Sequence, residues 1–593
     1  MFTIDYETEA IAHRPVYPPK PVSVAIKHDG LPATFYAWGH PEGNNCTEAE
    51  AVKALQDVWA SGEPLLFQNG KFDLDVAEVH HGLPIPHWSR IHDTQFLLYL
   101  HNPHARSLAL KPSAERILDW PPEEQDLVKL WVMSNVAGAK LSDWGAYICR
   151  VPADIVEPYC IGDVDRTYAL YCHLFPYIVE HGMEGAYDRE RELMPILLGA
   201  ERHGIRVDIY TMQQDLLMYE NAFDRVSNML VDMLGDINYN SGAQLANALL
   251  SNGYAASLPL TPTGKFQTNQ EALMSSVSNT ELLKLLGYRG ALKTCLGTFM
   301  RPWEAMACQT GRVHSTWHQT RGEQDKGGTR TGRLSSANPN LTNVPNDLAK
   351  RPPPKGCPPL PLMRSYLLPE PGHVWLKRDY SSQEIRVLGH FEDGALMNQY
   401  IANPYLDPHQ FAADLIIHLT GHTLTRNDVK RIAFSILYGS GAAALAKDLG
   451  VEPWQAQQFK NLYMAAFPDV EALSRDIKKR GRLGLPVRTV GGRLIFAEAH
   501  GGRDFSYKLL NHLIQGSAAD ITKEGVINYH NAGGCQMLAL VHDENNVSCP
   551  EDEIMKQSTL MEECMADIKG FDVPLTSDLY VGSNWETAKK VAA

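Results

Sequence analysis

The sequence predicts a multidomain protein in which an α/β unit comes first and a larger region of mixed α/β and α+β character follows. The chain has 593 residues, which suggests about three or four domains. Its pattern also changes along the chain. Short apolar strands alternate with helices up to about residue 185, helical periodicity dominates from 186 to 300, and strands mix with long helices from 301 to 593.

Local patterns predict the individual elements. Apolar runs at 2–5, 22–26 and 65–67 predict strands. The segment RELMPILLGAERHG has helical spacing and closes on Gly204, a typical end of a helix. The polar, Gly-rich segment 321–332 is typical of a mobile loop, and the proline-rich segment 351–361 of a stiff connector.

The composition excludes several classes of protein. No run approaches the roughly 18 uninterrupted apolar residues of a membrane helix. Met1 is followed at once by FTIDYETEA, without the basic and apolar regions of a secretory signal. The ten cysteines form no CxxC pair, which argues against a zinc site or a disulfide framework. We therefore expect a protein of the reducing cytoplasm with no membrane partner.

The net charge is less informative than the placement of charges. The formal net charge of −15 gives no indication of a nucleic-acid partner, whereas a basic patch would indicate one. Acidic side chains also gather where divalent cations are held, however, and a basic cleft can lie on an acidic protein.

Carboxylates in the N-terminal zone are spaced as metal ligands would be. Asp5 and Glu7 are two apart on an expected strand, so they point to the same side. Asp73 stands early in a helix, and Tyr159 and Asp163 share one helical face. Four carboxylates and a phenol suit a nuclease that uses two metal ions. The alternative is that each is an ordinary surface acid.

Two further acids end apolar strands in the C-terminal half. Asp379 follows an apolar strand start, and the segment EIRVLGHF after it has helical spacing. In LALVHDENNV, residues 538–547, an apolar run leads into Asp543 and Glu544. Two such acids brought together could hold two Mg²⁺ ions for in-line phosphoryl transfer. The alternative is two unrelated turns.

A helix with a basic and aromatic face is expected at 425–441. Its apolar residues fall at helical spacing and would face a core, and Gly439 and Gly441 would end it. The cations of its second face could grip a triphosphate and the aromatics could stack on a base and sugar. The alternative is a solvated basic stripe. This face consists of Arg426, Lys430, Phe434 and Tyr438.

Together these segments resemble DNA polymerase family A and are similar to the large fragment of bacterial DNA polymerase I. The N-terminal carboxylates, with HDTQFLLYL (92–100), resemble the motifs of DEDD exonucleases in their tyrosine variant. The polymerase motifs are matched, in order, by TGRLSSANPNLTNVP (331–345), DYSSQEIR (379–386), DPHQFAADL (407–415), RNDVKRIAFSILYG (426–439), NHLIQGSAADITK (511–523), VHDE (541–544) and VPLTSDLYVGSNWETA (573–588).

The resemblance implies an RNase H-like 3′→5′ exonuclease domain followed by a right-hand polymerase. Because Asp5 stands almost at the start, no room is expected for a 5′-nuclease domain. The expected boundaries are 1–185 for the exonuclease domain, 186–310 for the thumb, 311–391 and 506–593 for the two parts of the palm, and 392–505 for the fingers.

The resemblance also implies the metal ligands. Asp379, Asp543 and the backbone carbonyl of Tyr380 would hold two Mg²⁺ ions, with Mn²⁺ as a substitute, and Glu544 would assist. Tyr159 would orient the water that attacks in the exonuclease site. Two more Mg²⁺ ions there would be held by Asp5, Glu7, Asp73 and Asp163.

Roles toward the nucleotide are implied in the same way. Lys430 would also protonate the leaving pyrophosphate. Phe434 would stack on the incoming nucleotide, Tyr438 would lie near the templating base, and Glu384 would block a ribose 2′-OH. The triphosphate would be held by Arg426, Lys430 and His409.

Candidate DNA-binding residues lie in two regions. In the expected thumb, Arg289 and Lys293 are candidates for phosphate contacts, the alternative being solvated surface charges. Asn343 would bind DNA as well. Hydrogen-bond donors in the minor groove can test base pairing, because its N3 and O2 acceptors are shared by every correct pair. The residues expected at the primer terminus are Arg333, Asn511, Gln515 and His542.

The expected function is template-directed DNA synthesis with 3′→5′ proofreading. The expected partners are primer–template DNA, deoxynucleoside triphosphates, a helicase and a single-strand binding protein, and a monomer is expected. A compact polymerase of this kind is commonest among bacteriophages, so a phage genome in the host cytoplasm is the expected setting. The alternatives are a polymerase fold that keeps only exonuclease activity or only non-enzymatic DNA binding.

Three places depart from the family pattern. Residues 381–383 read Ser-Ser-Gln where Ser-Gln-Ile is usual, although the spacing from Asp379 to Glu384 is kept. The polar loop 321–328 is longer than in the bacterial enzymes. Asn545 and Asn546 stand where relatives keep an apolar strand, so we expect the return strand to be shorter or more exposed.

Overall fold

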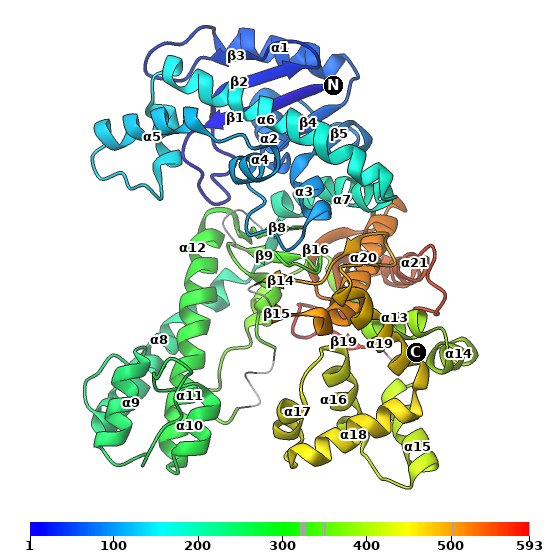
Figure 1. The fold of residues 1–593 in the computed structure, drawn as a ribbon. Coiled ribbons are helices and arrows are strands. Elements are labelled where there is room, and N and C mark those ends of the chain that lie inside the picture. Colours follow the sequence, from blue (N-terminus) through cyan, green and yellow to red (C-terminus); the bar gives the residue numbers. More distant parts are fainter. Residues whose placement is uncertain (321–327, 347, 349–350, 501–502, 592–593) are drawn as a thin grey trace.

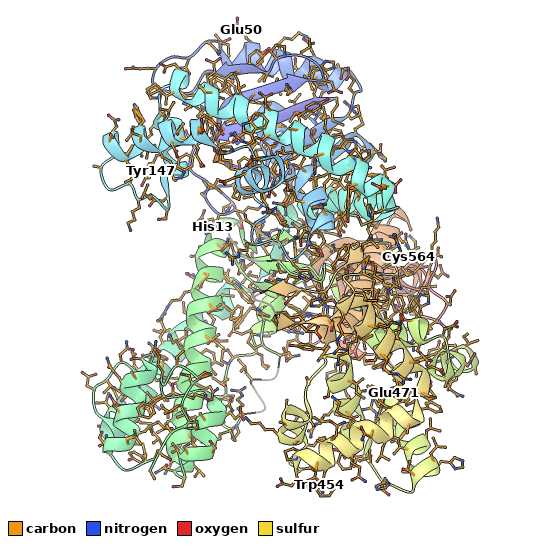
Figure 2. The ribbon with its side chains drawn as sticks, viewed as in Figure 1. His13, Glu50, Tyr147, Trp454, Glu471 and Cys564 are labelled. Atoms are coloured by element: carbon orange, nitrogen blue, oxygen red, sulfur yellow. The ribbon has the colours of Figure 1, made fainter. Side chains whose placement is uncertain are left out.

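The computed structural model describes the whole chain except residues 321–327, 347, 349–350, 501–502 and 592–593. The polar loop expected at 321–328 therefore lies, but for its last residue, outside the described residues. An N-terminal unit and two helical arms surround a central sheet (Figure 1). Glu50 lies at the outer end of the N-terminal unit, and Trp454 lies at the tip of one arm (Figure 2). No helix among the described residues is long and apolar enough to cross a bilayer.

The N-terminal unit, residues 1–181, is built on a five-stranded sheet of order β3-β2-β1-β4-β5. The central strand β1 pairs antiparallel with β2 and parallel with β4, and the strands expected from the sequence are confirmed. The long helix α6 packs across β1 and β2. The strands are β1 (Phe2–Thr8), β2 (Pro21–His28), β3 (Thr34–Ala37), β4 (Leu65–Phe67) and β5 (Ile91–Asp93), and the helices are α1 (Glu48–Ala60), α2 (Lys71–His81), α3 (Thr94–His101), α4 (Leu110–Leu118), α5 (Glu123–Asn135) and α6 (Ala153–Glu180).

Helix α7 (Glu184–His203) leads from this unit into the first arm and ends at Gly204, as its sequence predicts. The longer elements of the first arm, residues 209–310, are helices. Among them, α8 packs against α11 and α12. This confirms the helical character expected for 186–300. Its helices are α8 (Ile209–Leu234), α9 (Gly242–Ser251), α10 (Gln270–Ser276), α11 (Thr280–Thr294), the π-helical segment Cys295–Met300 and α12 (Arg301–Thr310).

The central sheet is antiparallel and has the order β16-β17-β11-β18-β19. Its middle strand β11 lies at residues 373–380, whereas the other four strands lie within residues 536–590. Helices α20 and α21 pack against each other beside the sheet (Figure 1). These elements are β11 (His373–Tyr380), β16 (Gln536–Val541), β17 (Glu544–Pro550), β18 (Ser577–Gly582), β19 (Lys589–Lys590), α20 (Leu509–Asn531) and α21 (Ile554–Ala566).

The second arm, residues 395–482, follows the short helix α13 (Gln383–Glu392). Within it, α16 begins where Thr425 and Asp428 form a reciprocal capping box. It ends at Leu437, followed by Tyr438 as the cap and by Gly439 in a left-handed conformation. The helix expected at 425–441 is therefore confirmed. The arm consists of α14 (Ala395–Ala402), α15 (Pro408–Thr420), α16 (Arg426–Leu437), α17 (Ala442–Leu449), α18 (Pro453–Ala466) and α19 (Pro468–Arg482).

Short elements connect these parts. The proline-rich segment 351–361 contains no helix or strand, as expected. A three-stranded sheet is formed by β10 (Leu367–Leu368), β6 (Ile205–Val207) and β7 (Arg312–Val313). Three hairpins pair β8 (Thr316–His318) with β9 (Ser335–Ala337), β12 (Val487–Arg488) with β13 (Leu494–Ile495), and β14 (Ala499–His500) with β15 (Arg503–Asp504). The 3₁₀ helices are Trp88–Arg90, Trp144–Arg150, Leu341–Asn343, Met363–Tyr366, Ser506–Lys508 and Glu551–Glu553.

Buried polar contacts join the N-terminal unit to the centre of the molecule. Arg493 donates to the Tyr99 hydroxyl of α3 at 2.7 Å and to Asp520 of α20 at 2.7 Å. Lys523 of α20 pairs with Glu190 of α7 at 2.5 Å, and both side chains are almost fully buried. Because a broken buried ion pair is costly, these contacts hold α3, α7 and α20 in one arrangement.

The expectation that Asn545 and Asn546 shorten or expose the return strand is wrong. β17 has seven residues, and the two asparagines are 3% and 0% exposed. Asn546 is accommodated because its side-chain oxygen accepts a hydrogen bond of 2.9 Å from the Trp375 indole on β11. The Trp375 ring in turn stacks on Trp585, with ring centroids 5.5 Å apart. The hydrogen bond between Asn546 and the Trp375 indole, whose N–H needs an acceptor, thus replaces apolar packing at this position.

Candidate active sites

A first carboxylate cluster lies on the N-terminal sheet. Asp5 and Glu7 project from β1, and α6 brings Asp163 against them, so that ligand atoms of the three lie within 4.8 Å of one another. Asp73, the fourth expected ligand, stands in the first turn of α2 and is not part of this tight group. One of its oxygens accepts a hydrogen bond of 3.0 Å from the Tyr6 backbone.

Burial and neighbouring charges raise the pKa values of the acids in and beside the first cluster. Burial and then the charges of Asp5 and Asp163 raise the pKa of Glu7 well above its usual range. Burial followed by Asp5 does the same to the pKa of Asp73. A nearby cation lowers the pKa of such crowded acids, so the donor set fits hard divalent ions with oxygen ligands.

Tyr159 lies one turn before Asp163 on α6, as their spacing predicts. Its ring meets Trp144 edge-on, with centroids 6.0 Å apart, and burial raises the pKa of its phenol. Lys111 of α4 lies 3.9 Å from the centre of the Tyr159 ring and pairs with an Asp163 oxygen. Lys111 was not expected, because no local pattern around it signals that α4 packs on α6.

A second group of acids lies at the end of the central sheet. Asp379 on β11 stands opposite Glu544 on β17, while His542 and Asp543 form the turn between β16 and β17. β11 continues through Asp379 to Tyr380, because it is paired on both sides there. Ligand atoms of these acids do not all come within the 4.8 Å that encloses the first cluster, among the described residues.

Electrostatics at the second centre also favour a cation. Burial, and then Asp543 and Glu544, raise the pKa of Asp379 to about 8, and burial raises the pKa of Asp543. Lys377 pairs with Glu544 at 3.0 Å and lowers the pKa of Asp379. Tyr380, whose backbone carbonyl is an expected ligand, ends β11, and its phenol donates to a carbonyl of α21 at 2.8 Å.

The expected nucleotide-binding face of α16 lines an open groove of about 550 Å³, to which Lys430, Phe434 and Tyr438 contribute. Lys430 is exposed there, whereas Arg426 is held by Asp407 at 2.6 Å. Beside the groove, the ring of His409 lies 6.0 Å from that of Phe434. Burial lowers the pKa of His409 to about 4, so its imidazole is neutral near pH 7.

Glu384 connects α16 to the second carboxylate centre. It stands in the first turn of α13, where one carboxylate oxygen accepts a hydrogen bond of 3.1 Å from Tyr438 and the other pairs with Arg333. Arg333 lines a small pocket together with His542 and Asp543 and lowers the pKa of Asp543. The structure thus brings these expected site residues together.

The other expected primer contacts lie on or near α20. Asn511 and Gln515 are one turn apart and half-buried, and Gln515 lowers the pKa of the Tyr438 phenol. The Asn511 side-chain oxygen accepts no hydrogen bond from the described residues. His542 is exposed on its turn, and Asn343 is exposed at the end of a 3₁₀ helix.

The two candidate phosphate contacts of the first arm differ. Arg289 donates to the Ser227 hydroxyl at 3.0 Å, and its guanidinium lies 4.7 Å from the Phe223 ring and 5.0 Å from the Tyr239 ring. It is therefore largely engaged in packing the arm. Lys293, one turn further along α11, is exposed.

The chain is similar to known proteins over most of its length. A family model described as DNA polymerase family A matches residues 211–587. DNA polymerase I of Chloroflexus aurantiacus is 27% identical over 96% of this chain and 60% of its own length. The thermostable DNA polymerase I of Thermus filiformis is 28% identical over 71% of this chain and 50% of its own length. The chain thus spans roughly half of these curated relatives.

A solved structure shares the fold. It is described as the POL domain of Pol1 from M. smegmatis in complex with DNA primer-template and dNTP. The similarity covers 99% of this chain and 96% of that one, with a TM-score of 0.78 and 23% sequence identity.

Proposed function

Because the chain belongs to DNA polymerase family A, we propose that it is a template-directed DNA polymerase that also removes nucleotides from a 3′ end. The observation that carries the proposal is the link between the acids at the end of the central sheet and the cationic face of α16. Tyr438, Glu384 and Arg333 join the two through one hydrogen bond and one ion pair. A triphosphate held by α16 would therefore lie beside carboxylates suited to divalent cations.

We assign the parts of the fold as follows. The two arms would be the walls of a DNA-binding groove and the central sheet its floor. Residues 1–185 would be the exonuclease domain, 186–310 the thumb, 311–391 and 506–593 the palm, and 392–505 the fingers.

In the polymerase centre, Asp379, Asp543 and the Tyr380 carbonyl would hold divalent cations, for which we propose Mg²⁺. Such ions, when bound, activate the primer hydroxyl and offset charge on the phosphates. Glu544 would support this centre. Primer–template DNA would be contacted by Arg333, Asn343, Asn511, Gln515 and His542, with Arg289 and Lys293 in the thumb.

The nucleotide would be held by side chains along α16 and beside it. Lys430 would bind the triphosphate and give a proton to the leaving pyrophosphate. Neutral His409 can donate one N–H to a phosphate oxygen without carrying a charge. Phe434 would stack on the nucleotide, and Glu384 would occupy the space of a ribose 2′-OH. Arg426 would add a charge-assisted contact after leaving Asp407.

In the first cluster, Asp5, Glu7, Asp73 and Asp163 would hold the cations of a 3′→5′ exonuclease. The Tyr159 phenol, which is protonated at neutral pH, would orient the attacking water as a hydrogen-bond donor. Helicase and single-strand binding protein are proposed partners. The proposed phage setting rests on resemblance alone: virion genes beside the coding sequence would support it, and a bacterial chromosomal neighbourhood would contradict it.

The proposal is tested by single-nucleotide addition to a labelled primer–template with Mg²⁺. The nucleotide complementary to the first template base should be added, and the other three should not. Failure to extend any primer, or addition without regard to the template base, would overturn it.

A further inference from the structure

Each of the two carboxylate centres contains a lysine in the same chemical setting. Lys377 stands two residues before Asp379 on β11, so both side chains project from one face of the sheet. Its ammonium pairs with Glu544 Oε1 at 3.0 Å and lies 4.5 Å from the centre of the Tyr580 ring. The Lys377 side chain is 10% exposed.

The first cluster repeats this arrangement with unrelated elements. Lys111 comes from a helix rather than a strand, and its ammonium pairs with Asp163 Oδ2 and lies 3.9 Å from the centre of the Tyr159 ring. Its side chain is 12% exposed. In both centres, therefore, an ammonium is held between one carboxylate oxygen and the face of a tyrosine, where cation–π attraction holds it.

The second oxygen of each paired carboxylate has no hydrogen-bond donor among the described residues. Glu544 Oε2 and Asp163 Oδ1 are buried and accept no hydrogen bond from the described residues. The Arg166 guanidinium lies 3.9 Å from Asp163 Oδ1. A buried carboxylate oxygen without a hydrogen bond is costly, so a further cation at either position would be stabilised.

We propose that Lys377 and Lys111 are resident counter-ions of the two centres, and that each sets the divalent-metal concentration which its own centre needs. The ammonium neutralises part of the carboxylate charge before any metal arrives. It thereby stabilises the metal-free centre and competes electrostatically with the incoming ion. Both are positioning residues: they orient Glu544 and Asp163 and do not themselves touch the reacting atoms.

The test uses two variants in a crossed design. Lys377→Met and Lys111→Met keep an apolar stem over the tyrosine and remove the charge. Lys377→Met should lower the half-saturating Mg²⁺ concentration of primer extension roughly three- to tenfold and leave that of 3′-end degradation unchanged. Lys111→Met should do the reverse, so each variant controls for the other.

Further variants separate charge from packing. Lys377→Arg and Lys111→Arg keep the cation and should behave like the wild type, and Lys→Gln at each position repeats the charge removal if a Met variant does not fold. Lys556→Met and Lys53→Met remove exposed lysines that pair with Glu553 and Asp57 and should change nothing.

A readout without catalysis follows thermal unfolding in EDTA and in Mg²⁺. The Met variants should unfold at lower temperature than the wild type in EDTA. Their unfolding temperature should also rise more than that of the wild type when Mg²⁺ is added. The extension and degradation measurements depend on the proposed function, whereas the unfolding measurement does not, so their failures are distinguishable. Unchanged or raised Mg²⁺ requirements together with an unchanged Mg²⁺ effect on unfolding would overturn the proposal.

Discussion

The hydroxyl of Tyr438 donates a hydrogen bond of 3.1 Å to Glu384, although the two residues are 54 positions apart in the chain. The bond joins the end of α16 to the start of α13 and fixes the carboxylate beside the expected ribose position. Replacing Glu384 with Ala should therefore raise ribonucleotide incorporation by roughly one to two orders of magnitude relative to deoxynucleotides.

Tyr438→Phe removes only the hydrogen bond and should raise ribonucleotide incorporation less than Glu384→Ala does. Competing ribo- and deoxynucleotide additions on one primer measure both ratios. Equal discrimination in Glu384→Ala and the wild type would show that Glu384 does not exclude the 2′-hydroxyl.

Lys430 offers an exposed ammonium on the groove side of α16. Lys430→Ala should slow nucleotide incorporation roughly 100-fold or more, because a transition-state contact to phosphate is lost, with little change in DNA affinity. Lys479→Ala is a control, since Lys479 is an exposed lysine of α19 that does not line this groove. Rapid-quench incorporation and DNA titration distinguish the two effects. An unchanged rate would remove Lys430 from the triphosphate site.

The raised pKa of Asp379 predicts how the metal-free protein responds to pH. Its folded-state pKa of about 8 lies above the value of 3.8 for an unperturbed Asp, so the folded chain binds the proton more tightly. The stability contributed by this proton is present below about pH 4 and is lost as pH rises toward 8.

In EDTA, the unfolding temperature of the wild type should thus fall relative to Asp379→Asn between pH 5 and roughly pH 8 to 9. Mg²⁺ should abolish that difference at high pH, because the metal replaces the proton. Thermal unfolding at several pH values, with and without Mg²⁺, measures this. A constant difference between the two proteins across the range would contradict the assignment.

The adjacent asparagines of β17 should respond oppositely to the same substitution. Asn546→Leu leaves the Trp375 indole without its acceptor and should destabilise the protein by about 1–3 kcal/mol. Neither polar atom of the Asn545 side chain has a hydrogen-bond partner among the described residues. Asn545→Leu should therefore be neutral or stabilising. Denaturant unfolding of both variants tests this, and equal losses would refute the account of the strand.

Local sequence patterns predict those parts of the fold and of the site that depend on residues close together in the chain. The four-residue spacing of Tyr159 and Asp163 placed both on one face of α6, and Thr425 and Gly439 lie at the two ends of α16. The contacts of Lys111 were not predictable, because they depend on α4 packing beside α6.

The position of Lys377 is predictable from the sequence, because a residue two positions before Asp379 on a strand lies on the same face of the sheet. The error at Asn545 and Asn546 has a different cause. One strand's residues do not reveal the cross-strand neighbour, and it is Trp375 on β11 that makes a buried amide tolerable there.

We propose that one chain carries two separate centres, one for DNA synthesis and one for 3′-end removal. The most direct measurement follows one labelled primer–template with Mg²⁺, with and without nucleotides, for the wild type, Asp543→Ala and Asp5→Ala. Asp543→Ala should lose extension and keep degradation, Asp5→Ala should keep extension and lose degradation, and the wild type should show both. Loss of both activities in either variant, or degradation that survives in Asp5→Ala, would contradict the account.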